Sequence, residues 1–201
     1  MKRIDLQKYD EAAAIAVALE VLRMGGIVAY PTETFYALGA MASSEEALSK
    51  LFSLKERGAE KAASLIIGTP SDADRLAAEV TPLAKKLMAA YWPGPLTLVL
   101  RAAEGLSSYI TKEDTVALRV PGDSFALRLA RAAGFPITAT SANPAGEPPS
   151  VTADEVERYF KDSVNLLIDG GPAPGGEPST IVDATSDTPR VLRQGELKVS
   201  E

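Results

Sequence analysis

Short apolar runs alternate along the chain with longer segments of helical periodicity. Residues 10–24 are rich in Ala, Leu and Val at helical spacing and stop at Gly25-Gly26, the kind of position where helices end. The apolar runs are too short for helices and are bounded by Gly, Pro and polar residues, which is typical of strands. We therefore expect strands at residues 27–30, 64–67, 96–100, 116–120, 136–140, 165–168, 180–182 and 191–193.

Capping side chains mark the starts of the helical segments. Ser43 and Glu46 have capping-box spacing and open a helix that is predicted to end near residue 57. The other expected helices begin at Ser71, at Thr81-Pro82, at Asp123 and, with a second capping box, at Thr152 and Glu155. Because helices and strands alternate in this way, we predict a mixed α/β fold in which helices cover both faces of a mixed sheet.

Composition limits the number of domains and the chemistry. At 201 residues, with 46% hydrophobic and 24% charged, the chain can close one substantial core, so we expect a single domain over residues 1–201. It contains no cysteine and no histidine. This excludes disulfides, thiolate nucleophiles, imidazole bases, Ser-His-Asp triads and Cys/His zinc sites. Any chemistry must use carboxylates, cations, hydroxyls, backbone amides or a metal bound through oxygen.

Charge and hydropathy bear on partners and location. The net charge of -6 argues against a protein held on nucleic acid mainly by neutralising phosphates, although a local basic cleft is compatible with it. Residues 1–10 lack the apolar centre of a signal peptide, and no apolar run approaches the ~18 residues of a membrane helix. We therefore expect a cytoplasmic protein that has no membrane segment.

Polar side chains at strand ends are the first candidates for function. Thr32 and Thr34 flank Glu33 directly after the strand at 27–30, and apolar residues follow at once, so this is either an unusual turn or a segment that faces a ligand. Arg119 lies on the minority face of an otherwise apolar strand. If both sheet faces are covered, its guanidinium needs an anionic partner such as a ligand carboxylate; if that face is exposed, it needs none.

Two further segments have a functional and a purely structural interpretation. Lys55, Arg57 and Lys61 cluster around a predicted helix end, where cations either complement the helix dipole or bind an anion. Ser141 and Asn143 follow the strand at 136–140, where they either stabilise a turn or contact a ligand.

Taken together, these motifs carry a family resemblance. In order, and over nearly the whole chain, the sequence contains PTETFYALG, KER, VALRVP, TSANPAGEPPSVT, DGG, STIVD and VLRQG. In this it resembles the YrdC-like family of threonylcarbamoyl-adenylate synthases, in the short form without a second domain. The resemblance implies a twisted, open mixed sheet with a deep, positively charged central cleft. It also implies an enzyme that makes threonylcarbamoyl-AMP and pyrophosphate from L-threonine, bicarbonate and ATP.

The same resemblance implies roles for individual residues. Thr34 and Arg119 would bind threonine, with Arg119 on its carboxylate, and Lys55 and Arg57 would be catalytic. The ATP side would be lined by Lys55, Arg57, Lys61, Thr115, Ser141, Asn143, Ser150 and Arg193. The cofactor would be Mg²⁺ held mainly by the ATP phosphates, with no metal ligand assigned to the protein. Glu33 is a candidate for the base that deprotonates the threonine amine.

The chain departs from the family pattern at several positions. Ala37 stands where most members have Gly, and if this position requires positive φ, Ala adds about 1 kcal/mol of strain. Phe35 replaces a smaller aliphatic residue, and Ala62-Ala63 replaces Pro-Leu. Pro149 falls at an expected nucleotide-contacting serine, so Ser150 is assigned to that contact instead.

The partners implied are the three substrates and a downstream complex that transfers the threonylcarbamoyl group to tRNA, with at most weak tRNA binding by this chain. Two alternatives remain open at this point. One is an RNA-binding protein that uses the same cleft, and the acidic composition weighs against it. The other is a carbamoyl-transfer enzyme related to hydrogenase maturation factors.

Overall fold

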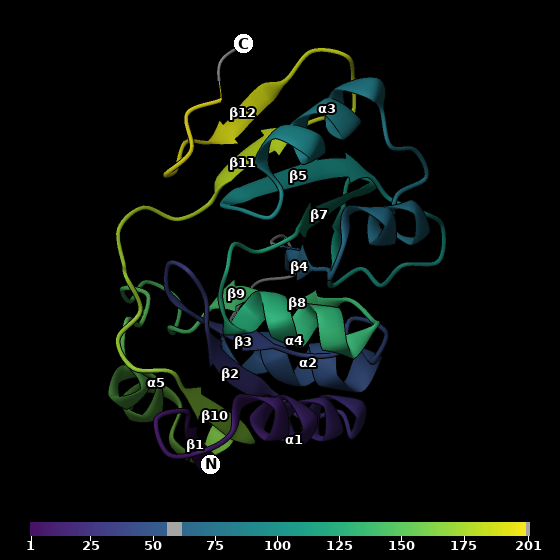
Figure 1. Ribbon diagram of the computed structural model, residues 1–201. Coiled ribbons are helices and arrows are strands. Elements are labelled where there is room, and N and C mark those ends of the chain that lie inside the picture. Colours follow the sequence, from purple (N-terminus) through teal and green to yellow (C-terminus); the bar gives the residue numbers. More distant parts are fainter. Residues whose placement is uncertain (56–61, 200–201) are drawn as a thin grey trace.

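The chain forms two mixed β-sheets that meet at a shared corner (Figure 1). The computed structural model describes residues 1–55 and 62–199. The five-stranded sheet has the order β1 (Lys2–Asp5), β10 (Leu166–Asp169), β2 (Val28–Pro31), β3 (Tyr36–Gly39) and β9 (Thr140–Ser141). The seven-stranded sheet has the order β12 (Arg190–Arg193), β11 (Thr180–Asp183), β5 (Leu96–Arg101), β7 (Thr115–Arg119), β4 (Leu65–Ile66) and β8 (Ile137–Thr138), and β6 (Thr111–Lys112) pairs with β7.

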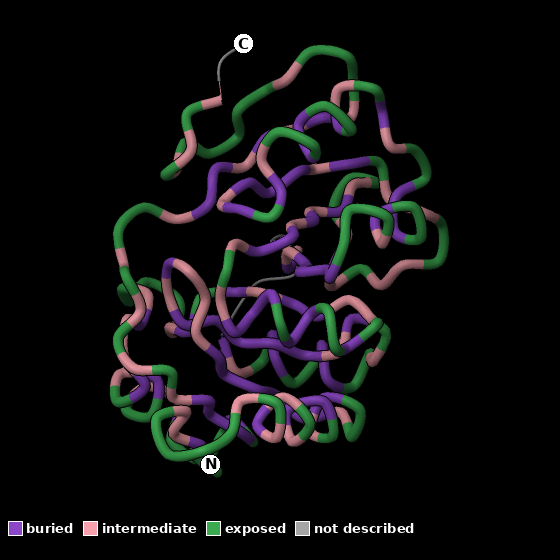
Figure 2. The backbone as a smooth tube through the Cα atoms, in the orientation of Figure 1, coloured by how far each residue is buried: buried purple, intermediate pink, exposed green. Residues whose placement is uncertain are grey.

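Helices cover both faces of the five-stranded sheet. The helical elements are α1 (Glu11–Arg23), α2 (Glu45–Leu54), η1 (Pro70–Arg75), α3 (Pro82–Tyr91), α4 (Phe125–Ala133), α5 (Ala153–Phe160) and η2 (Lys161–Ser163). Val28 and Tyr30 pack in one apolar cluster with α1 and α4, whereas Ala29 packs in another with α2 and α5. Alternate residues of one strand therefore bury both faces. Figure 2 shows buried residues along the strands in the lower half of the molecule. Among the described residues, none of the helices is both long enough and apolar enough to cross a bilayer.

The seven-stranded sheet has one apolar face and one that carries polar residues. Leu98 of β5 and Leu118 of β7 lie side by side in the cluster that α3 covers. The residues next to them, Thr97 and Arg119, lie on the other face because side chains alternate along a strand. The sequence left open whether the face that carries Arg119 is covered or exposed. The Arg119 side chain is only 12% exposed, so that face is covered at this position.

The single expected sheet is divided because the expected strand 136–140 changes sheets. Ala139 separates β8 from β9, and its N–H donates to the carbonyl oxygen of Ser64 at 2.8 Å. One residue earlier, the hydroxyl of Thr138 accepts from the N–H of Ala40 at 2.8 Å and ties β8 to the end of β3. The chain therefore passes directly from the seven-stranded sheet to the five-stranded sheet at Ala139, and the mixed α/β class with helices on both faces of a sheet is confirmed.

The structure moves three of the expected helix starts. Ser124, not Asp123, caps α4 by accepting from the N–H of Leu127. Ser44, not Ser43, caps α2 by accepting from the N–H of Ala47. The expected helix at Ser71 is the 3₁₀ helix η1, and the capping box that starts it is made by Thr69 and Asp72. Local spacing could not separate adjacent serines, since either can accept from a first-turn N–H. The caps at Thr81 and at Thr152 with Glu155 are confirmed.

Ala37 lies in a regular strand and not in a strained turn. It pairs with Tyr30 on one side and Ser141 on the other, and positive φ occurs at non-glycine positions of the described chain only at Glu113, Asp114 and Lys161. The conditional expectation of strain at this position therefore does not apply. The buried methyl group of Ala37 instead joins the apolar cluster under α1 and α4.

We expect Ala37→Gly, which restores the family's usual residue, to lower the free energy of unfolding by about 1 kcal/mol. Glycine inside a strand loses more backbone entropy on folding, and the variant also loses a buried methyl group. Urea denaturation measures the change, with Ala117→Gly in the half-buried part of β7 as a matched strand control. A more stable Ala37→Gly variant would mean that the alanine is strained.

Candidate active site

The turn between β2 and β3 is held together by one hydroxyl group. Thr32 Oγ1 accepts from the N–H groups of Thr34 at 3.1 Å and Phe35 at 3.2 Å, and it donates to the carbonyl oxygen of Phe35 at 2.7 Å. Since its single proton and both of its lone pairs are used there, the Thr34 hydroxyl, 3.2 Å from it, is not needed to satisfy Thr32. Thr32 therefore shapes the turn, and the lone pairs of the Thr34 hydroxyl remain as acceptors.

Glu33 leaves this turn and contacts the other sheet. Its Oε1 accepts from the N–H of Gly122 at 2.8 Å and from Nη2 of Arg119. Arg119 Nε also donates to the carbonyl oxygen of Gly94 at 3.0 Å. The side chains of Arg119 and Glu33 are only 12% and 17% exposed, so this is a largely buried ion pair. Sequence reasoning treated Glu33 only as a candidate base and did not find this pair.

Arg119 keeps its charge in this environment. Burial, followed by the positive charge of Arg193, lowers the pKa of Arg119 to about 10. The charge of Glu196, followed by that of Tyr30, raises this pKa, and a pKa near 10 leaves the guanidinium protonated at neutral pH. The residue can therefore hold an anion at pH 7.

Arg193 lies on the same face of the seven-stranded sheet as Arg119. It pairs with Ile181 on β11, which pairs with Thr97 on β5, the residue next to the Leu98–Leu118 pair. Arg193 donates through Nε and Nη2 to the carbonyl oxygen of Ser179, at 3.1 and 2.8 Å, and desolvation lowers its pKa. The second predicted cation is therefore fixed near the first.

Thr115 is at the far end of β7 from the Glu33–Arg119 pair. It shares the face of Arg119 but lies four residues away, about 13 Å along an extended strand. Its hydroxyl donates to the carbonyl oxygen of Lys112 at 2.6 Å. The structure thus places Thr115 on the expected face without bringing it to the ion pair.

Three of the predicted ATP-side residues, Lys55, Ser141 and Asn143, lie close together around the end of β9. Lys55, buried at the C-terminal end of α2, donates from Nζ to the carbonyl oxygen of Ser141. The amide nitrogen of Asn143 donates to the carbonyl oxygens of Pro144 at 3.1 Å and Glu147 at 2.5 Å. Because those acceptors fix the amide orientation, Oδ1 of Asn143 is directed away from them. Lys55, Ser141 and Asn143 are therefore neighbours.

Ser150 is hydrogen-bonded to the start of the loop after β9. It is buried, and its hydroxyl donates to the carbonyl oxygen of Ala142. Its own carbonyl accepts from the N–H of Tyr36 at 2.9 Å, while the N–H of Ala142 donates to the carbonyl of Tyr36 at 2.9 Å. The hydroxyl proton of Ser150 is thus used within the protein. The predicted residues Arg57 and Lys61 lie outside the described residues.

Tyr36 joins the two halves of the site. Its backbone N–H and carbonyl form hydrogen bonds with Ser150 and Ala142, at the two ends of the loop after β9. Tyr36 also closely follows the turn that carries Glu33 and Thr34. Its hydroxyl donates to the carbonyl of Gly171 at 2.7 Å and accepts from the N–H of Gly170 at 3.2 Å. Burial raises the pKa of Tyr36 to about 12, so this hydroxyl remains a donor. The ring packs with Leu38 in the core under α2 and α5 and does not line the site.

Two buried acceptor atoms in this region are left without hydrogen bonds. Among the described residues, the buried side-chain nitrogen and oxygen atoms without a partner are Glu33 Oε2 and Asn143 Oδ1. Such atoms are rare because an unpaired buried polar group is costly, and they often mark functional positions. One lies on the predicted threonine side and the other on the predicted ATP side. We therefore take the region between the two loops as the candidate active site.

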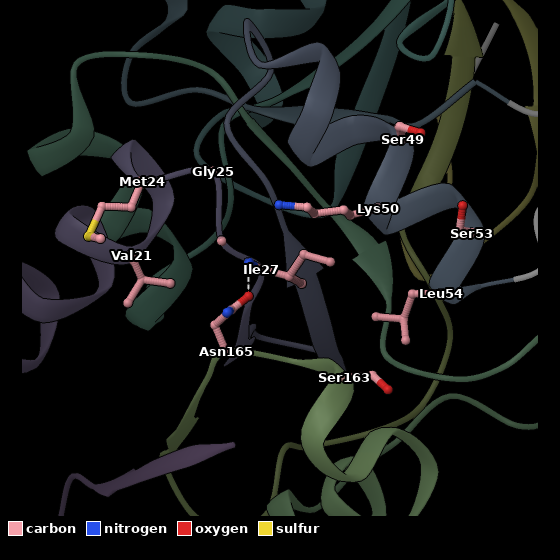
Figure 3. Close-up of a pocket in the computed structure, with 11 residues that line it drawn as sticks. Val21, Met24, Gly25, Ile27, Ser49, Lys50, Ser53, Leu54, Ser163 and Asn165 are labelled. Carbon is pink, nitrogen blue, oxygen red and sulfur yellow. Dashed lines mark hydrogen bonds between the residues drawn. The ribbon is translucent and has the colours of Figure 1, made fainter.

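A separate hollow lies elsewhere on the molecule. An open depression of about 640 Å³ lies between the end of α1, the outer face of α2 and the start of β10. Figure 3 shows the side chains that line it. Its lining includes Met24, Lys50 and Asn165, and Asn165 Oδ1 accepts from the N–H of Ile27 at 2.8 Å. None of the predicted site residues lines it.

The fold and site define a class of protein: a mixed α/β protein with a buried arginine–carboxylate pair where two sheets meet. Comparison with known proteins gives the family. A family model named Sua5/YciO/YrdC and described as "Telomere recombination" matches residues 20–195. The chain therefore belongs to the Sua5/YciO/YrdC family, and the sequence-based resemblance is confirmed.

Relatives of known name and structure agree with this assignment. The threonylcarbamoyl-AMP synthase of Pyrococcus abyssi is 38% identical over 199 residues, which is 98% of this chain but 58% of the relative. The crystal structure of P. abyssi Sua5 complexed with L-threonine matches with a TM-score of 0.89 and 36% identity over 96% of this chain and 57% of that one. Escherichia coli YciO matches with a TM-score of 0.84 and 28% identity, covering 96% and 94%. The chain thus spans little more than half the length of the P. abyssi relative.

Proposed function

We propose that the protein is an L-threonylcarbamoyladenylate synthase, a nucleotidyltransferase that makes threonylcarbamoyl-AMP and pyrophosphate from L-threonine, bicarbonate and ATP. The observation that carries this proposal is the junction at Tyr36. It connects the turn bearing Glu33 and Thr34, which reaches Arg119, to the loop where Lys55 and Asn143 lie. An amino-acid subsite and a phosphate-binding subsite side by side are what this reaction requires. The P. abyssi structure with L-threonine supports the same substrate.

The reaction needs no nucleophile from the protein. The threonine amine combines with bicarbonate to give a carbamate and water. A carbamate oxygen then attacks the α-phosphorus of ATP, and the bond from that phosphorus to the bridging oxygen of pyrophosphate breaks. Alignment and charge neutralisation carry such a step, so a chain without histidine or cysteine can perform it.

In this proposal the described residues bind and orient the substrates. Arg119 holds the threonine carboxylate, and the Thr34 hydroxyl accepts a hydrogen bond from the same ligand. Lys55 and Arg193 neutralise phosphate charge, and Asn143 Oδ1 accepts from a donor on the nucleotide. The proposed roles of the remaining ATP-side residues, Arg57, Lys61, Thr115, Ser141 and Ser150, follow from the family resemblance.

Magnesium fits this arrangement as an ion brought by ATP. The described residues contain no group of three or more carboxylates that would hold a metal by itself. Magnesium characteristically binds substrate phosphates with few protein ligands, and there it would neutralise charge on the transferred group.

The product determines the proposed partners. A threonylcarbamoyl group linked to AMP is an activated acyl group, so a transfer complex that modifies an adenosine of tRNA must consume it. The proposal places the protein in the cytoplasm, where ATP and tRNA occur, and includes only weak, salt-sensitive tRNA binding by the chain itself.

We expect pyrophosphate release from ATP and Mg²⁺ to require both L-threonine and bicarbonate. The physical reason is that the attacking oxygen exists only after the amine has formed its carbamate. A coupled pyrophosphate assay, with each component omitted in turn, measures the dependence. Equal release without threonine would exclude the synthase.

The same assay separates the alternatives. Release that depends on carbamoyl phosphate would favour a carbamoyl-transfer enzyme, and a protein that only binds RNA would release no pyrophosphate. The synthase is favoured over both by the name of the P. abyssi relative and by the amino-acid subsite at Arg119.

A further inference from the structure

The Glu33–Arg119 pair is more restrained than an arginine that only binds a ligand carboxylate would need to be. Arg119 is held by the carbonyl of Gly94 as well as by Glu33, and Glu33 is held by the N–H of Gly122 as well as by Arg119. The backbone of Gly122 also approaches Glu33 closely, since a Cβ there would lie 3.2 Å from Glu33 Oε1. The carboxylate is therefore fixed from both sides through one oxygen.

Each partner retains an unused hydrogen-bonding atom. Glu33 Oε2 is buried without a partner. The contacts of Arg119 use Nε and Nη2, so Nη1 has no hydrogen bond within the described part of the chain. A purely structural arginine–carboxylate pair would normally satisfy both oxygens in a bidentate arrangement. Here the donor Nη1 of Arg119 and the acceptor Oε2 of Glu33 remain unused on two side chains that are hydrogen-bonded to each other.

These two atoms match the two charged ends of an amino acid. An α-amino acid carries its carboxylate and its ammonium on one carbon atom, so a site that binds it needs a cationic donor and an anionic acceptor within a few ångströms. Arg119 Nη1 and Glu33 Oε2 meet that requirement because the Nη2–Oε1 contact joins their groups. Among the buried side-chain atoms of the described residues, no other carboxylate oxygen lacks a hydrogen bond.

We propose that Glu33 recognises the amine of the substrate: its Oε2 accepts a hydrogen bond from the ammonium of the amino acid whose carboxylate Arg119 holds. This makes Glu33 a specificity-determining residue that selects amino acids over hydroxy acids, and it rests on the proposed function. Because Oε2 is out of contact with solvent, the ligand reaches it when the turn that carries Glu33 shifts, while Oε1 keeps its bonds to Arg119 and Gly122.

Calorimetric titration of the full chain with two ligands tests this inference. One ligand is L-threonine, and the other is the hydroxy acid in which the threonine amine is replaced by a hydroxyl group. We expect the wild type to bind threonine about 10- to 100-fold more tightly, the usual effect of a hydrogen bond between charged groups. In Glu33→Gln, threonine binding weakens by that factor while binding of the hydroxy acid changes little.

The matched control is Glu104→Gln, the same substitution at an exposed position between β5 and β6. It should leave both affinities unchanged. If Glu33 only positions Arg119, Glu33→Gln will weaken both ligands equally, and the inference is wrong. Equal binding of both ligands by the wild type overturns it without any variant, so the test does not depend on the folding of Glu33→Gln.

The failure of this inference can be distinguished from failure of the proposed function. If the wild type releases pyrophosphate only with threonine, but Glu33→Gln keeps the preference for threonine, then the role of Glu33 alone is wrong. If the wild type binds no threonine, both proposals are wrong.

Discussion

Lys55→Met is expected to slow threonine-dependent pyrophosphate release by roughly 10²- to 10³-fold. Lys55 is almost fully buried, and its ammonium is fixed beside the loop of Asn143 by a hydrogen bond to the carbonyl oxygen of Ser141. A cation held in place before reaction stabilises the charge that develops on the phosphates without reorganising, and removing one such group has effects of this size. Methionine keeps the unbranched shape of the side chain and removes only the charge and the donor. The turnover number at saturating ATP and threonine measures the effect.

The control for this variant is Lys50→Met on the same helix. Lys50 is exposed and pairs with Glu46 one turn earlier at 2.7 Å, a surface contact worth little. It should keep normal turnover. Urea denaturation of Lys55→Met should show a loss of about 3 kcal/mol or less, the range for hydrogen bonds made by a charged group. Normal turnover in Lys55→Met would mean that Lys55 has only a structural role, as a cation at the end of α2 that is hydrogen-bonded to Ser141.

Arg119→Met is expected to lower the free energy of unfolding by about 3 kcal/mol, because it leaves the carboxylate of Glu33 buried without its cation. For a chain of this length, the melting temperature should fall by about 6–12 °C. The double variant Arg119→Met/Glu33→Gln removes the uncompensated charge as well, so it should recover about 2 kcal/mol relative to the sum of the single changes. Thermal and urea unfolding of the four proteins complete the cycle.

Arg75→Met provides the matched arginine control. Arg75 pairs with Asp72 at 2.5 Å, but its side chain is 65% exposed, so the loss should stay below about 1 kcal/mol. If the changes in unfolding free energy at positions 33 and 119 are strictly additive, the two side chains are not coupled. The Glu33–Arg119 pair would then not support the proposed amino-acid subsite.

Features with local causes could be predicted from the sequence. The capping box at Thr152 and Glu155 and the start of α3 at Thr81 depend on contacts within one turn, and both are confirmed. The short strands β1 and β6 were not predicted, because their stability comes from pairing with distant segments and not from their own residues. The division into two sheets could not be predicted for the same reason. The chain changes sheets at Ala139, whose N–H forms a hydrogen bond with the carbonyl oxygen of Ser64, a residue far away in sequence.

The candidate site divides along the same line. The motifs indicated Lys55, Ser141 and Asn143 separately, and the structure brings them together. The partner of Arg119 could not be identified, because Glu33 lies 86 residues away and no local pattern connects the two. One signal was available: an arginine on the minority face of an apolar strand needs an anion, and a carboxylate between two threonines after a buried strand is a natural source of one.

The position of the Glu33–Arg119 pair has a consequence for dividing the chain. Glu33 extends from the five-stranded sheet and Arg119 belongs to the seven-stranded one. The exposed turn at Glu104 and Gly105 falls between them in sequence. Two polypeptides separated at that turn would each carry one half of the proposed amino-acid subsite, and neither would carry both. Recovery of threonine binding on mixing would therefore serve as a complementation assay, in which the ligand itself reports reassembly of the two halves.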